Sequence, residues 1–314
     1  MKLLPISDDV ISLDDIDKRI ILELDLDCRM TYQKMADKLG LTATAIKKRV
    51  TKLLEQGVID RFITTLNFDM IDSDLLLAII QTDGSEYQED FIEKMGNDPK
   101  VIQVSSVACG KGGLYCVFAV TSGVTALSDF GAFVRTLEPV IDSEIHVLLY
   151  PRGKKTTLTN LQLRVLKQLV DNPRMSIVEL AELAGMTARR VRRIIDELQE
   201  SEGILFSVYW NLGIGGLTEV LLRIEWDEKT ASHEEIIDTL RREYPLEFWT
   251  PFISAAYPVV FARFVVEKLE TIESIARTVR RSPYVKSLST LVLYSNNIFD
   301  WPGVTELKCL LDTV

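Results

Sequence analysis

Apolar residues recur three or four positions apart near the start of the chain, which is the spacing of one buried helix face. Three such sets predict three short helices: Ile16, Ile20, Ile21 and Leu24; Met35, Ala36 and Leu39; Ile46, Val50 and Leu53. Thr31 and Thr42 stand where the second and third helices would begin, and threonine is a common helix cap. Gly40 follows the second helix and favours the left-handed conformation that ends a helix sharply. The pattern therefore predicts three helices with a tight turn between the second and the third.

The same pattern returns in the second half of the chain. A constant offset of 145 residues aligns the segment from Leu13 to Leu53 with the segment from Leu158 to Leu198 without a gap. The identical pairs include Leu13/Leu158, Arg19/Arg164, Leu24/Leu169, Arg29/Arg174, Met30/Met175, Ala36/Ala181, Gly40/Gly185, Thr42/Thr187, Ala43/Ala188 and Leu53/Leu198. Ser176 and Glu179 have the spacing of a capping box at the second helix of this copy. The sequence is therefore an internal duplication.

After each helical unit the apolar period becomes that of β-strands. In the first half the expected order is strand 75–81, helix 87–95, strand 101–108, strand 114–120, helix 124–137 and strand 141–149. In the second half it is a strand from 217 to 226, helix 234–243, a strand ending at 255, strand 259–266, helix 272–280 and strand 285–294. This βαββαβ order predicts a ferredoxin-like antiparallel sheet with both helices on one face.

The predicted fold class is α+β, a tandem repeat of a three-helix winged helix-turn-helix and a ferredoxin-like βαββαβ domain. The expected boundaries are 13–66 and 158–210 for the helical units, 67–152 and 211–296 for the ferredoxin-like domains, and 297–314 for a C-terminal tail with a helix at 304–311. Each helical unit is expected to carry a β-ribbon wing, at 57–66 and 203–210. We expect the two ferredoxin-like domains to pack sheet against sheet as an intrachain pseudo-dimer. Further association into a homo-oligomer, through sheet edges or the tail, stays open.

Helical units of this kind bind DNA by laying the third helix in the major groove. In the first copy the outward face of this helix carries Thr44, Lys47, Lys48 and Lys52, and in the second copy it carries Arg189, Arg190, Arg192 and Arg193. Thr42 and Thr187 are interpreted first as helix caps and second as phosphate contacts. Arg61 in the first wing either reaches a phosphate or pairs with Asp60. These residues form the predicted DNA-binding site.

The chain as a whole is acidic, since its 314 residues carry a formal net charge of −10. Such a charge argues against indiscriminate coating of nucleic acid, so DNA contacts are expected only at the local basic faces. The first ten residues lack the apolar core of a signal peptide, and no run approaches the roughly 20 apolar residues of a membrane span. We therefore expect a cytoplasmic protein. Its four cysteines form no C-x-x-C pair, so no metal site is expected.

The segment from Leu13 to Arg61 resembles the DNA-binding domain of the Lrp/AsnC family of transcription regulators. The residues that carry this resemblance are Leu13-Asp14-Asp15-Ile16-Asp17, Arg29 with Tyr32, Met35-Ala36, Leu39-Gly40-Leu41-Thr42, Lys48-Arg49-Val50 and Gly57-Val58-Ile59. The second unit keeps Ser176, Leu180-Ala181 and Gly185-Met186-Thr187. The resemblance implies a prokaryotic regulator that binds double-stranded DNA sequence-specifically. In this family the βαββαβ domain pairs with a second copy and often binds an amino acid, so a small-molecule effector is a candidate partner.

The family's effector loop commonly has a glycine followed closely by an aspartate, and this chain departs from that pattern. Its loop is Gly110-Lys111-Gly112-Gly113, which has no carboxylate. Such a loop could present N–H groups to an anion, with help from Lys111, or it could be an ordinary hairpin turn. The corresponding loop of the second half, 255–258, has no glycine.

Two alternatives to the regulator hypothesis stay open. Duplicated chains of this type also resemble siroheme decarboxylases, whose site would need cationic and imidazole groups, and His146 and His233 are the only histidines. The other alternative is a small-molecule sensor or scaffold whose helical units bind protein partners. Because no signature of nucleotide, hydrolase or metal chemistry occurs, we expect a protein that is not an enzyme and needs no cofactor.

Overall fold

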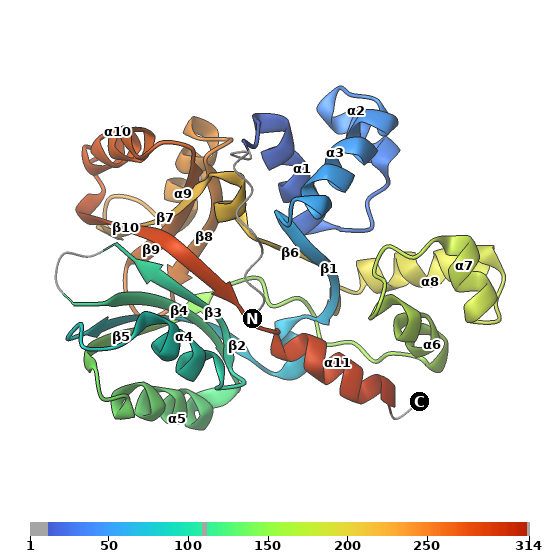
Figure 1. Cartoon of the computed structure of the whole chain (residues 1–314), viewed down its shortest axis with the longest axis horizontal. Helices are drawn as coiled ribbons and strands as arrows, with labels where there is room; N and C mark the ends of the chain where they lie inside the picture. The colour runs from blue at the N-terminus through green and yellow to red at the C-terminus, as the bar shows by residue number, and fades with distance from the viewer. Residues whose placement is uncertain (1–11, 109–111, 313–314) are drawn as a thin grey trace.

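The computed structural model describes residues 12–108 and 112–312, and it consists of two helical units beside one barrel (Figure 1). The first helical unit contains α1 (Asp15–Leu26), α2 (Tyr32–Leu39) and α3 (Ala43–Glu55). The second contains α6 (Asn160–Leu169), α7 (Ile177–Leu183) and α8 (Ala188–Glu200). The order and type of these helices are those that the apolar spacing predicts.

The predicted helix ends are present in the structure. The hydroxyls of Thr31 and Thr42 accept hydrogen bonds from backbone N–H groups in the first turns of α2 and α3. Gly40 ends α2 in the left-handed conformation, with a φ of 68°. At Ser176 only half of the expected capping box forms, because the hydroxyl accepts from the Glu179 N–H but no return bond from the Glu179 side chain is made.

Each half of the chain also contributes four strands and two helices to the barrel. In the first half these are β2 (Asp74–Thr82), α4 (Gln88–Gly96), β3 (Val101–Val107), β4 (Leu114–Thr121), α5 (Gly123–Thr136) and β5 (Val140–Leu149). In the second half they are β7 (Thr218–Trp226), α9 (His233–Glu243), β8 (Phe248–Ser254), β9 (Val259–Val266), α10 (Leu269–Arg280) and β10 (Val285–Ile298). A short 3₁₀ turn leads into each set, η1 (Phe68–Ile71) and η2 (Leu212–Gly215).

The two sheets are joined along both edges into a closed barrel. Its strand order is β10-β3-β4-β2-β5-β8-β9-β7, so each half keeps the ferredoxin-like order and meets the other half at β5–β8 and at β10–β3. The barrel encloses a core with side chains from both halves, among them Leu77, Phe118, Leu221 and Phe261. The two inner faces therefore form one core within one chain. The junction of β10 with β3 is the longer one, and β5 meets β8 only at its end, where Leu148 and Leu149 lie opposite Ser254 and Ile253.

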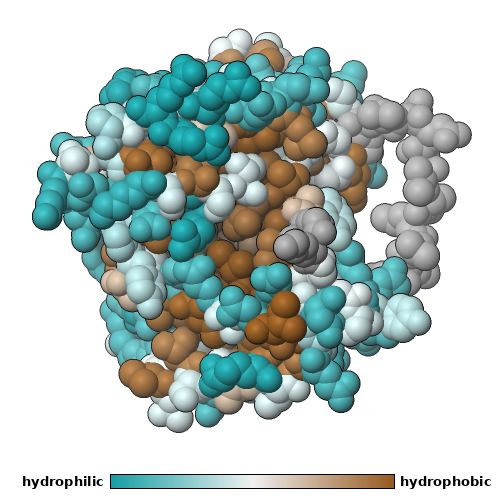
Figure 2. Space-filling view, turned by 90° about the vertical axis from the view of Figure 1, so that its left-hand side faces the viewer, coloured by the Kyte–Doolittle hydropathy of each residue, from teal (hydrophilic) through white to brown (hydrophobic). Residues whose placement is uncertain are grey.

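The helices cover the outside of the barrel in two layers. The α4 and α5 helices pack on the strands of the first half, and α9 and α10 pack on those of the second half (Figure 1). On the face of the barrel turned away from the helical units, hydrophobic residues gather between two hydrophilic zones (Figure 2). No helix in residues 12–108 and 112–312 is long and apolar enough to cross a membrane.

Two expectations from the sequence are wrong where strands cross between the halves. The predicted separate wings do not form, because β1 (Ile59–Leu66) and β6 (Ile204–Trp210) pair with each other in one antiparallel two-stranded ribbon. The predicted tail does not begin at residue 297, because β10 continues to Ile298 and pairs with β3 of the first half, with Asn297 opposite Val104. Both differences arise because a strand of one half takes its partner from the other half.

The end of the chain packs on the second helical unit. The last helix, α11 (Pro302–Asp312), is slightly longer than the predicted helix at 304–311. Leu307 and Leu311 of α11 are buried in the same core as Leu166 and Leu198 of α6 and α8. The helix therefore ties the end of the second half to the helical unit of that half and to the β1–β6 ribbon.

A reciprocal exchange of arginines holds the two helical units together. Arg29 of the first unit donates to backbone carbonyls of the second unit, and Arg174, its counterpart in the repeat, donates to backbone carbonyls of the first. The acceptors are the carbonyls of Pro173 and Met175 for Arg29, and those of Cys28 and Met30 for Arg174. The Arg174 guanidinium also lies 4.7 Å from the centre of the Tyr32 ring. This symmetry explains why the arginine is identical in both copies.

We expect the Arg174→Ala substitution to lower the free energy of unfolding by about 1–3 kcal/mol, because two carbonyls lose a charged donor. Urea unfolding followed by circular dichroism measures this loss. The matched control is Arg190→Ala, which removes an exposed arginine and should change stability by no more than about 0.5 kcal/mol. Equal stability of the two variants would contradict the role of the exchange.

Candidate nucleic-acid interface

The first candidate surface is the outward face of α3. Ile46, Val50 and Leu53 are buried and fix which side of the helix faces the core. The opposite side exposes Thr44, Lys47, Lys48 and Lys52. None of these lysines forms an ion pair with any residue that the structure describes. Their charges are therefore available to a ligand.

Arg49, on the flank of α3, has a different role. Its guanidinium lies 2.8 Å from carboxylate oxygens of both Asp14 and Asp17 at the start of α1. Hydrogen bonds to Asp17 and Asp14 raise the pKa of Arg49 above its usual value. The residue therefore links α3 to α1 and helps to set the orientation of the exposed lysines.

The second candidate surface is the outward face of α8. Val191, Ile195 and Leu198 are buried, and the four arginines at 189, 190, 192 and 193 are exposed. Within the described residues, only Arg193 of these four forms an ion pair, at 2.8 Å with Glu197 one turn later. Such an exposed pair contributes little to stability and can exchange for a phosphate. The α8 face therefore carries a denser positive charge than the α3 face.

Thr42 and Thr187 are the N-caps of these two helices. Thr42 Oγ1 accepts from the Ala45 N–H at 3.2 Å, and Thr187 Oγ1 accepts from the Arg190 N–H at 3.3 Å. Both threonines are exposed at the helix start. The capping role that the sequence predicts is thus present, and a phosphate contact by either residue stays a prediction.

Arg61 already has acidic partners on the ribbon. It lies 3.2 Å from Asp60, it also pairs with Asp300, and it lies 4.7 Å from the centre of the Tyr209 ring. The pairing with Asp60 was one of the two alternatives that the sequence left open. The contact with Asp300 had no signal in the sequence, because the two residues meet only through the packing of the tail.

The glycine loop between β3 and β4 is described only in part, because Gly110 and Lys111 lie outside the described residues. The Gly113 N–H donates to Thr82 Oγ1 at 2.9 Å, so it is not free to bind an anion. Glu86 accepts from the same Thr82 hydroxyl at 2.6 Å, which adds a negative charge beside the loop. Gly112 has a φ of 64°, as a turn residue requires. These contacts favour the hairpin-turn interpretation for Gly112 and Gly113.

The two histidines lie in different surroundings. His146 on β5 is buried, with Nδ1 2.9 Å from Ser254 Oγ and the ring edge-on to Phe261. Burial lowers its pKa, and this effect outweighs the opposing effect of Glu144. His233 begins α9 and lies 3.1 Å from Glu234. Among the described residues, the two imidazoles have different polar partners, because His146 also lies 2.9 Å from Glu144 whereas His233 lies beside Glu234.

Two of the three cysteines in the described part of the chain lie in its core. Cys28 and Cys116 are buried, and burial raises the pKa of each thiol to about 12. Within residues 12–108 and 112–312, no group of three or more histidine, cysteine, aspartate or glutamate side chains could hold a metal ion.

Sequence and structure comparisons identify the family. Residues 13–54 match the model of the AsnC-type helix-turn-helix domain, and residues 158–202 match a model of winged helix-turn-helix DNA-binding domains. An uncharacterized HTH-type transcriptional regulator of Pyrococcus abyssi is 31% identical over 142 residues, which cover 44% of this chain and 92% of the relative. The chain belongs to the AsnC-type (Lrp/AsnC) family of transcription regulators. Its duplicated helix-turn-helix units place two family-type DNA-binding domains in one polypeptide.

Other relatives of this family are matched over a shorter part of their length. An HTH-type transcriptional regulator of Mycobacterium tuberculosis is 44% identical over 55 residues, which cover 18% of this chain and 37% of the relative. The regulator FL11 of Pyrococcus furiosus is 31% identical over 93 residues, 29% of this chain and 61% of FL11. The chain thus spans less than two thirds of these two regulators.

A solved structure has the duplicated fold over nearly the whole chain. The siroheme decarboxylase NirDL, in complex with an iron-uroporphyrin III analogue, matches with a TM-score of 0.53 at 16% identity. The match covers 96% of this chain and 99% of NirDL. At this level of identity the likeness concerns the fold alone, and it extends over both halves of the chain.

Proposed function

We propose that this chain binds double-stranded DNA sequence-specifically and uses both α3 and α8 to contact one duplex. The observation that carries the proposal is the exposure of unpaired cations on the outward faces of both third helices, in a chain whose net charge is −10. Charge complementary to phosphate is thus concentrated on the two helices that a helix-turn-helix protein inserts into the major groove.

The contacts between the two helical units support a single-chain counterpart of a dimer. The β1–β6 ribbon and the exchange of Arg29 and Arg174 give the units fixed positions relative to each other. One chain therefore offers two recognition helices at a defined separation. A cytoplasmic location and a small-molecule effector are parts of the same proposal, and further association of chains would use surfaces outside this pairing.

The four arginines of α8 provide the direct test of DNA binding. Their replacement by alanine should weaken binding to a selected genomic fragment at least about tenfold. It should also reduce the slope of the logarithm of the binding constant against the logarithm of the salt concentration, by about one for each lost phosphate contact. The fold should persist because all four side chains are exposed. Fluorescence anisotropy over a range of salt concentrations measures both quantities.

A matched control removes four exposed arginines from the barrel helices. It replaces Arg241, Arg242, Arg277 and Arg280 by alanine. This control changes the net charge by the same amount but should bind DNA with the affinity of the wild type. Equal loss in both variants would indicate a general charge effect, and absence of any preferred genomic fragment would overturn the proposal.

The two recognition helices differ, so the two half-sites should differ. The face of α3 carries threonine and lysine, whereas the face of α8 carries arginine, which forms bidentate hydrogen bonds with guanine. We expect selected operators to contain two unequal half-sites, the one under α8 richer in guanine, with a spacing of about 10 base pairs or a multiple of it. Sequencing of fragments selected from a genomic library tests this. A perfectly palindromic operator would contradict it.

The fold match with NirDL makes a siroheme decarboxylase the second candidate function. The contacts of the two histidines argue against it, because the buried His146 is already paired with Ser254 and His233 with Glu234, whereas a tetrapyrrole site of the kind expected would need imidazoles directed at the ligand's carboxylates. We therefore expect that adding siroheme to the protein leaves the absorbance spectrum of siroheme unchanged. A shifted spectrum, together with loss of carboxylate groups from the siroheme, would favour the enzyme over the regulator.

A further inference from the structure

The two seams that join the halves of the barrel are unequal. At the longer seam, β10 pairs with β3 over five residue pairs. At the shorter seam, β5 meets β8 through two residue pairs, which involve Leu148 and Leu149. A further hydrogen bond, from the Ala255 N–H to the Val147 carbonyl at 2.8 Å, extends this seam. The β5–β8 seam therefore depends on few backbone contacts.

The duplication gives the shorter seam a matched position in the longer one. The offset of 145 residues continues along β5 and β10, where identical residues are Val140/Val285, Val147/Val292 and Leu148/Leu293. By this offset His146 corresponds to Leu291. By the pairing across each seam, Ser254 corresponds to Val107. The shorter seam thus has a histidine and a serine where the longer seam has a leucine and a valine.

His146 contacts both strands of the shorter seam. Its side chain is buried, and Nδ1 lies 2.9 Å from Ser254 Oγ on β8. Nε2 lies 2.9 Å from Oε1 of Glu144, but the two groups are not aligned for a hydrogen bond, so this buried nitrogen has no hydrogen-bond partner among the described residues. The ring is edge-on to Phe261 and Tyr257. The imidazole therefore has one aligned polar partner and two aromatic neighbours.

A second ring proton is unfavourable in this position. A protonated imidazole has two N–H donors, and one of them would be buried here without an aligned acceptor. Among the described residues, the charged or titratable groups that face His146 are Glu144, Arg223 and Tyr257. Arg223 lies 2.9 Å from the same Glu144 oxygen and offsets its charge. Burial lowers the pKa of His146, and Arg223 acts in the same direction, whereas Glu144 acts against both.

We propose that His146 is a pH-sensitive latch of the barrel: a proton on its ring opens the β5–β8 seam while the β10–β3 seam stays closed. In the open seam water solvates the imidazolium, so the cost of burying its charge is removed. The two halves stay joined by the β10–β3 seam and the β1–β6 ribbon, so the opening is local. This latch does not depend on the proposed DNA-binding function.

The direction of the effect follows from the linkage between proton binding and opening. An imidazole in water has a pKa of about 6.5, and His146 in the closed seam has a lower one. The open seam therefore binds a proton as the pH falls through about 6.5, and the closed seam does so only at lower pH. Between these two values, each pH unit raises the ratio of open to closed seams by up to about tenfold.

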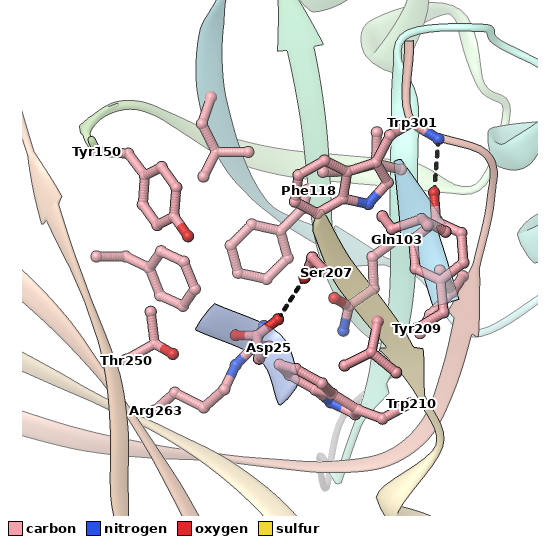
Figure 3. A pocket seen from close by; sticks show the side chains of 16 residues that line it. Asp25, Gln103, Phe118, Tyr150, Ser207, Tyr209, Trp210, Thr250, Arg263 and Trp301 are labelled. Carbon is pink, nitrogen blue, oxygen red and sulfur yellow. Dashed lines mark hydrogen bonds between the residues drawn. The ribbon is translucent and has the colours of Figure 1, made fainter. Parts of the chain in front are cut away.

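A second group that titrates near this range lies in a separate cavity, between the β1–β6 ribbon and the barrel. This cavity of about 100 Å³ has Asp25 of α1 on one wall, and Arg263 of β9 points toward it (Figure 3). Burial raises the pKa of Asp25 to about 6. Because the folded chain holds this proton more tightly than the unfolded chain, Asp25 stabilises the fold as the pH falls, which is the opposite of the effect of His146.

Hydrogen exchange of two equivalent amides in the full chain tests the latch. The Ala255 N–H donates to the Val147 carbonyl at the shorter seam, and the Ala108 N–H donates to the Val292 carbonyl at the longer seam. After correction for intrinsic exchange, the protection of the Ala255 amide relative to the Ala108 amide should fall about three- to tenfold from about pH 7.5 to about pH 5.5. Nuclear magnetic resonance of the labelled protein measures both amides.

Variants assign the effect to His146. His146→Leu copies the residue at the matched position of the longer seam, and His146→Gln keeps a polar group beside Ser254 if the leucine variant fails to fold. In both variants the relative protection should no longer depend on pH. The control is His233→Gln, which changes the other histidine of the chain and should keep the pH dependence.

Three results would overturn the latch. The first is a relative protection that stays constant or rises as the pH of the wild type falls. The second is an equal loss of protection at both amides, which would indicate opening of the whole barrel. The third is a His146→Gln variant that keeps the pH dependence of the wild type.

Discussion

Pairing of strands between the two halves is the constraint on which the rest of the structure depends. Within its own half, neither β1 nor β6 has a neighbour, and each finds one only in the other half. The barrel follows the same rule, because β5 pairs with β8 and β10 pairs with β3. A single half would expose these edges, and exposed edges invite pairing with other chains. Duplication in one chain provides each edge with its partner.

This pairing also determines where the candidate DNA-binding faces lie. The ribbon and the exchange between Arg29 and Arg174 join the two helical units directly, so α3 and α8 are not independent modules on flexible linkers. Both helices lie on the side of the molecule away from the barrel helices (Figure 1). The chain can therefore be acidic overall while two short basic helix faces act together. The same architecture brings Asp25 of a helical unit and Arg263 of the barrel to the walls of one cavity.

Local features of the fold could be predicted from the sequence because they depend on neighbouring residues. The caps at Thr42 and Thr187 and the left-handed Gly40 need only the adjacent turn, and the exposed faces of α3 and α8 follow from helical periodicity. Strand partners could not be predicted, since alternating residues reveal which face is buried but not which strand lies alongside. The contact between Arg61 and Asp300 and the opposition of Asp25 and Arg263 depend on that pairing, so no local pattern indicated them.

The central claim is that two different helices of one chain contact two halves of one operator. Hydroxyl-radical footprinting of two charge-reversal variants tests it most directly: Lys47→Glu with Lys48→Glu on α3, and Arg189→Glu with Arg190→Glu on α8. The account predicts that the wild type protects both halves of the site and that each variant loses protection of a different half. Loss of the same half in both variants, or protection by the wild type of a single half only, would contradict it.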